Sequence, residues 1–147
     1  MTPRIFTTSI ISLILLSGIF ACSNKSSIKE VNDDGMTIQL RKVKNSPDDA
    51  GVLTYATRLI PEKVLLSSSD NKLNTALWYH MDSCFYLQAG ERKIYAAIIQ
   101  PIANGVTGTF EYLLSFDAAG MRNHRWSLVY QDKYLNHKKY TLSLESE

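Results

Sequence analysis

The residue types best suited to covalent chemistry stand together in one short run, residues 80–84 (HMDSC). A cysteine, a histidine and an acid could form a nucleophilic pair in which Asp82 orients His80 and His80 activates Cys84. On an extended strand, however, His80 and Cys84 would lie roughly 13 Å apart at about 3.3 Å per residue, whereas a hydrogen bond needs about 3 Å. Because a free cysteine beside Phe85 is commonly a small buried residue, we expect Cys84 to be a core thiol and expect no catalytic residues.

The three histidines give little support for a metal site. His80, His124 and His137 are far apart in the chain and fall in different expected elements, and neither an HxH nor a CxxC spacing occurs. Structural zinc needs four such ligands that converge. We therefore expect no bound metal, and we expect His124 and His137 to be polar loop residues.

Other polar segments have ordinary explanations. The pairs Asp33-Asp34 and Asp48-Asp49 lie in polar stretches and lack the spacing of a calcium loop. The segment 105–108 (GVTG) has two glycines but no following helix or lysine, so it predicts a turn and not a phosphate site. We expect no cofactor and no enzymatic activity.

A basic and aromatic run, residues 132–140 (DKYLNHKKY), is the clearest candidate for a binding surface. It could contact acidic lipid, a glycan or a protein, since tyrosine anchors many interfaces; a solvated hairpin is the plainer alternative. An aromatic-lined groove that contains Trp78, Tyr79 or Trp126 would instead favour a small ligand. The candidate binding residues are Tyr134, His137, Lys138, Lys139 and Trp78.

In most of the segments that must position these residues, apolar and polar side chains alternate with a period of two, which is typical of half-buried strands. In Lys93–Gln100 the run is almost continuously apolar, which predicts a strand covered on both faces. Leu73–Gln88 is long and aromatic, and we expect one or two strands there with a bend near Asp82-Ser83. The other expected strands are Met36–Arg41, Val52–Ile60, Phe110–Phe116, Trp126–Tyr130 and Tyr140–Glu145.

About seven or eight short strands separated by turns, with no helical period, predict an all-β domain over residues 36–147. We expect a single antiparallel β-sandwich of immunoglobulin-like or transthyretin-like kind, and a closed β-barrel is the alternative. The length of 147 residues fits one domain, and 45% apolar residues exclude a disordered chain. A net charge of +2 gives no general case for nucleic acid binding.

The first residues indicate an exported protein. Arg4 precedes an apolar run from Ile10 to Phe20, and this run of about 11 residues would cover roughly 16 Å of a bilayer core about 30 Å thick. It is therefore too short to span a membrane and is typical of a signal peptide.

The end of that run, residues 19–22 (IFAC), resembles the lipobox of bacterial lipoproteins, with Ile19, Ala21 and Cys22 at the matching positions. The resemblance implies removal of residues 1–21, attachment of a diacylglyceryl group to Cys22 and stable anchoring by two or more acyl chains. Ser23 follows Cys22, and no inner-membrane retention Asp stands there, which favours the outer membrane, facing the periplasm. We expect residues 22–35 to be a lipidated cysteine and a flexible tether.

Three functional hypotheses remain. The first is a non-enzymatic, membrane-anchored module that binds another envelope protein, in the manner of accessory lipoproteins of secretion systems; this likeness is one of layout alone. The second is a periplasmic lipoprotein that binds a ligand, a glycan or a toxin, as immunity proteins do. The third, a hydrolase that uses His80, Asp82 or Cys84, has the least support.

Overall fold

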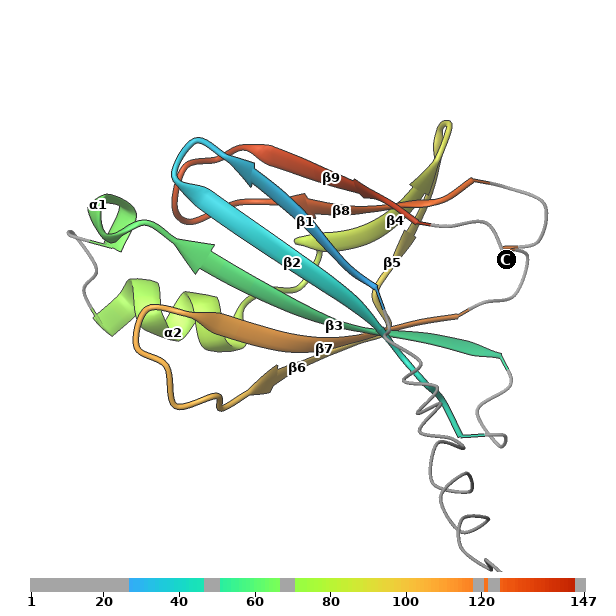
Figure 1. The fold of residues 1–147 in the computed structure, drawn as a ribbon, viewed down its shortest axis with the longest axis horizontal. Coiled ribbons are helices and arrows are strands. Elements are labelled where there is room, and N and C mark those ends of the chain that lie inside the picture. The colour runs from blue at the N-terminus through green and yellow to red at the C-terminus, as the bar shows by residue number, and fades with distance from the viewer. Residues whose placement is uncertain (1–26, 47–50, 67–70, 118–120, 122–124, 145–147) are drawn as a thin grey trace, which may run out of the picture.

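The computed structural model describes residues 27–46, 51–66, 71–117, 121 and 125–144. Within them the chain forms nine strands and two short helices (Figure 1). The elements are β1 (Ile28–Asp33), β2 (Met36–Val43), β3 (Val52–Pro61), α1 (Lys63–Leu66), α2 (Asn71–Tyr79), β4 (Phe85–Ala89), β5 (Arg92–Tyr95), β6 (Ile98–Ile102), β7 (Phe110–Asp117), β8 (Ser127–Gln131) and β9 (Lys139–Ser143).

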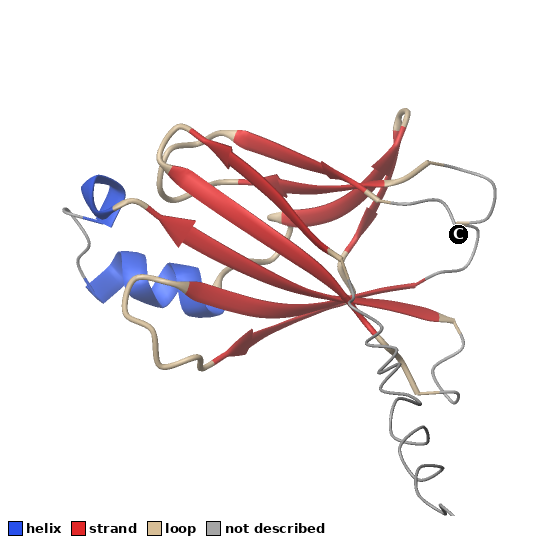
Figure 2. Ribbon diagram, in the orientation of Figure 1, coloured by secondary structure: helices blue, strands red, loops and turns tan. Residues whose placement is uncertain are grey.

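The strands form two antiparallel sheets, which confirms the predicted all-β sandwich (Figure 2). One sheet has five strands in the order β1-β2-β3-β7-β6, and the other has four in the order β5-β4-β8-β9. The chain passes between the sheets where β5 leads into β6, and there the Ala97 N–H donates to the Ser115 carbonyl at 2.8 Å. At the opposite edge, Lys29 Nζ on β1 donates to the Ser143 carbonyl on β9 at 2.8 Å.

The inner faces of the sheets supply the core, and their alternation is the one that the sequence predicts. On β7 the buried side chains are every second residue, from Phe110 to Phe116. Phe85 stacks on Tyr130 with ring centroids 4.9 Å apart, which joins β4 to β8. The remaining fully buried large side chains are Met36, Ile38, Leu59, Leu77, Leu87, Tyr112, Leu114, Leu128 and Val129.

The prediction of strands throughout Leu73–Gln88 is wrong in its first half, where α2 forms instead. A helix is recognised in a sequence by apolar residues that recur every three or four positions and face the core. In α2 only Leu77 of nine residues is buried, so this pattern is weak. Tertiary packing holds α2 over one end of the core: Tyr112 Oη donates to the Leu77 carbonyl, and Trp78 packs against Phe110 with centroids 5.8 Å apart.

The prediction of one strand over Lys93–Gln100, covered on both faces, is also wrong. The segment divides into β5 and β6 at the corner where it changes sheet. Both pieces lie at sheet edges, and Tyr95 and Ile98 are 50% and 58% exposed. Edge strands often carry charges or proline, which discourage pairing with other chains, and Lys93 and Pro101 fit that pattern.

The predicted flexible tether over 22–35 is wrong in its second half, because β1 pairs with β2 along its whole length. The two strands are joined by Asp34-Gly35, and both residues have positive φ (47° and 76°). An Asp-Gly pair with positive φ at both positions makes a two-residue turn that suits hairpins. The domain therefore begins at β1 and not at Met36, and residues 1–21 and Cys22 lie outside the described residues.

Thr57 is a core position on β3 that carries a fully buried hydroxyl without a partner. It is fully buried, and its Oγ1 has no hydrogen bond. A buried polar group left unpaired costs about 1–3 kcal/mol. We therefore expect Thr57→Val to raise the free energy of unfolding by about 1 kcal/mol in urea denaturation.

Thr141→Val is the matched control, because Thr141 lies exposed on β9, and we expect it to change stability by less than about 0.5 kcal/mol. A loss of stability in Thr57→Val would contradict the prediction and would indicate that the hydroxyl has a partner.

Candidate functional site

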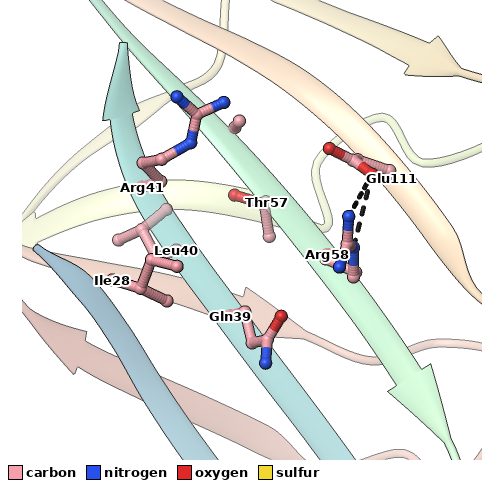
Figure 3. A pocket seen from close by; sticks show the side chains of 8 residues that line it. Ile28, Gln39, Leu40, Arg41, Thr57, Arg58 and Glu111 are labelled. Atoms are coloured by element: carbon pink, nitrogen blue, oxygen red, sulfur yellow. Dashed lines mark hydrogen bonds and ion pairs between the residues drawn. The ribbon is translucent and has the colours of Figure 1, made fainter. Parts of the chain in front are cut away.

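The outer face of the five-stranded sheet carries a shallow depression with a volume of about 110 Å³ (Figure 3). Ala56 on β3 is the smallest side chain among its lining residues. The depression is lined by Ile28, Gln39, Leu40, Arg41, Ala56, Thr57, Arg58 and Glu111.

Strand register brings these residues together from segments far apart in the chain. Ile28, Arg41 and Ala56 lie in one row across β1, β2 and β3. Gln39 and Arg58 lie in the next row, which continues to Glu111 on β7. The burial of alternate residues of β2 in the core requires Gln39 and Arg41 to point outward.

The two arginines of the depression differ in their partners. Arg58 donates to Glu111 Oε2 from Nη2 at 3.0 Å and from Nε at 3.3 Å. Gln39 Nε2 donates to Glu30 Oε2 at 2.7 Å. Within the described part of the chain, Arg41 has no hydrogen-bond or ion-pair partner, and Figure 3 shows its guanidinium group apart from the Arg58–Glu111 pair.

The volume of the depression indicates what it can hold. Pockets for drug-sized ligands are typically about 300–1,000 Å³, and this depression of about 110 Å³ is well below that range. It could receive one side chain of a partner, and the surrounding sheet face could contact the rest of that partner.

The sequence-predicted binding run forms a loop between β8 and β9 that is organised by Asp132, which is 2% exposed. Asp132 Oδ1 accepts from Tyr130 Oη at 2.7 Å, and Oδ2 accepts from the backbone N–H of Asn136 at 2.6 Å. The other backbone N–H donors to this carboxylate are those of Tyr134, Leu135 and His137.

Most of the candidate binding residues in this loop contact other parts of the same chain. Tyr134 Oη donates to the His80 carbonyl, and Lys138 forms an ion pair with Asp34 in the β1–β2 turn. Lys139 Nζ donates to Gln88 Oε1 at 3.1 Å. The loop thus contacts two neighbouring segments, residues 80–83 before β4 and the β1–β2 turn, whereas Lys139 belongs to β9. A role in binding stays a prediction.

His137 and Trp78, the other two candidates, are not brought together. His137 is exposed and has a positive φ of 59°. Trp78 lies on α2, where it is half-buried and packs against Phe110. Trp126 is 5% exposed and Tyr79 is 72% exposed, so these aromatic residues differ widely in exposure. None of these three aromatic residues lines the depression on the five-stranded sheet, and an aromatic-lined groove stays a hypothesis.

Cys84 is a buried thiol, as the sequence predicts. Desolvation by burial raises its pKa to about 11, which disfavours the reactive thiolate. His80 and Asp82 are exposed on the loop before β4. The described residues contain no group of three or more His, Cys, Asp and Glu side chains that could hold a metal ion. His124 and the pair Asp48-Asp49 lie outside these residues.

Two further results concern membrane-spanning helices and similarity to known proteins. No helix within the described ranges is long and apolar enough to cross a membrane. Comparison of the sequence and structure with protein-family models, curated proteins and solved structures found no match.

Sequence reasoning missed the depression at Arg41 and Ala56. The alternation of β2 does mark Arg41 as an outward residue, but one sequence does not reveal which residues of β1 and β3 lie beside it. The pairing register supplies that information.

The hydrogen bonds to Asp132 predict a dependence of stability on pH. Burial alone would raise the pKa of this carboxyl group, but the hydrogen bonds from Tyr130 and the backbone N–H groups outweigh it and lower the pKa below its usual 3.8. The stabilisation is therefore fully present above the pKa of the unfolded chain and is lost as the pH falls through the lower, folded-state pKa.

We expect Asp132→Asn to lower the free energy of unfolding by about 2 kcal/mol at pH 7, as measured by urea denaturation. The difference from the wild type should shrink below a pH of about 4, where the wild-type carboxylate becomes protonated. Asp34→Asn is the control, because its ion pair with Lys138 is exposed and should be worth less than about 1 kcal/mol. A difference that stays constant down to low pH would contradict this role of Asp132.

Proposed function

We propose that the chain is a bacterial lipoprotein, anchored through Cys22 in the outer membrane and facing the periplasm, whose β-sandwich binds another envelope protein. The lipobox-like residues 19–22 support the anchor. Because β1 begins at Ile28, residues 23–27 are all that separate it from Cys22. At about 3.5 Å per residue, this segment would keep the start of β1 within roughly 20 Å of the lipid.

The outer face of the five-stranded sheet is the observation that carries the proposed protein interaction. It combines a depression large enough for one side chain, an unpartnered Arg41 and the exposed apolar Ile28, which is 62% exposed. Arginine and a neighbouring apolar surface are features that recur at the centre of protein interfaces.

A ligand or glycan site has less support, because it would need an aromatic-lined groove. Trp126 is buried, and Trp78 packs against Phe110. If the bound protein is a toxin, the crosslinking experiment described next would identify it.

Photo-crosslinking in the native cells tests this proposal. A photoreactive amino acid at Gln39 should form a covalent adduct with one envelope protein, because Gln39 lines the depression. The same group at Thr141, exposed on β9 of the other sheet, is the control and should give no adduct of that mass.

Cys22→Ser tests the anchor in the same cells. We expect the wild-type chain in the membrane fraction with an acyl-modified N-terminal cysteine by mass spectrometry, and we expect the variant to carry no lipid. A wild-type chain without lipid would contradict the anchor, and equal adducts at Gln39 and Thr141 would contradict the proposed interface.

A further inference from the structure

We infer that the depression receives the carboxylate side chain of an Asp or Glu residue of the partner, and that Arg41 forms an ion pair with it. The existence of the partner rests on the proposed function, whereas the preference for a carboxylate rests on the charges and the shape of the depression.

The charges of the depression are unbalanced. Its charged lining residues are Arg41, Arg58 and Glu111. Glu111 pairs with Arg58, and its side chain is 17% exposed, so this acid is already engaged and largely covered. The positive charge of Arg41 is therefore the one that a partner could neutralise.

Among the described residues, the cross-strand neighbours of Arg41 include no acid. Across the strands it lies opposite Ile28 on β1 and Ala56 on β3. The nearest acid on β1, Glu30, lies opposite Gln39 and accepts a hydrogen bond from it. A guanidinium group presents a planar set of N–H donors that matches the two oxygens of a carboxylate.

The shape of the depression suits a short acidic side chain. Its volume of about 110 Å³ is enough for several water molecules and so for a short side chain. The floor at Ala56 is 9% exposed, and the rim at Ile28 is apolar. When a partner covers this rim, water is excluded from the ion pair, which strengthens its electrostatic attraction.

The experiment uses the chain from residue 22 onward with Cys22→Ser, which contains every described element. The probes are two blocked tripeptides, acetyl-Ala-Glu-Ala-amide and acetyl-Ala-Gln-Ala-amide, which differ in charge but hardly in shape. NMR titration would follow the Arg41 Nε–Hε signal and the backbone amides of Gln39, Ala56 and Arg58.

We expect the Glu peptide to give saturable shifts at these positions in the millimolar range, with a Kd about two- to fivefold lower than that of the Gln peptide, because an exposed ion pair is worth up to about 1 kcal/mol. Arg41→Gln should abolish this difference by removing the cation. Ala56→Leu should weaken binding at least tenfold, because it fills the depression while Arg41 remains. Glu111→Gln should strengthen binding, since it removes a competing negative charge beside the site.

Lys93→Gln is the matched control, because it removes one exposed positive charge on β5 of the opposite sheet and should leave the titration unchanged. The spectrum of each variant reports whether the fold is retained. Equal binding of the two peptides, shifts spread over lysines across the surface, or binding of inorganic phosphate in preference to the Glu peptide would each overturn the inference.

The two proposals can fail separately. Selective binding of the Glu peptide without an adduct at Gln39 in cells would overturn the envelope partner but support the carboxylate preference. An adduct at Gln39 with equal binding of the two peptides would overturn the carboxylate preference and support the partner.

Discussion

The pairing of β2, β3 and β7 is the constraint on which the rest of the structure depends. Strands β2 and β7 bury alternate residues in the core, and a slip of one residue would turn their apolar faces outward. The register is therefore fixed by the burial of residues such as Ile38, Leu59 and Phe110. The same register determines the outer face, and it sets Arg41 beside Ala56 as a consequence of core packing.

A second constraint is local: the Asp132 carboxylate orders the loop between β8 and β9. The loop between β8 and β9 has few apolar residues to hold it, and its backbone N–H groups are turned toward one carboxylate. The ordered loop then contacts the β1–β2 turn through Lys138 and the segment before β4 through Tyr134. Residues 132–140, which the sequence suggests as a binding surface, therefore also hold neighbouring segments of the sandwich together.

The sequence predicted those features that depend on local alternation. Phe110–Phe116 shows a period of two along its whole length, and there the strand and its buried face were both predicted correctly. The prediction failed where tertiary contacts decide the structure. The helix α2 has one fully buried residue, and β1 is half-exposed and polar, so neither carries a strong pattern of its own. The Asp34-Gly35 turn was the available signal for β1.

The depression could not be predicted because its lining residues come from four strands, β1, β2, β3 and β7, whose pairing register decides which residues lie side by side. A single side-chain contact there provides modest affinity, since a surface ion pair is worth about 0–1 kcal/mol before water is excluded. Under the proposed anchoring, however, the chain and an envelope partner share the space near one membrane, which raises their effective concentration. At this raised concentration, an interface of modest affinity is sufficient for the complex to form. The charge of Arg41 would then serve mainly to select the partner, and it would contribute less to the strength of binding.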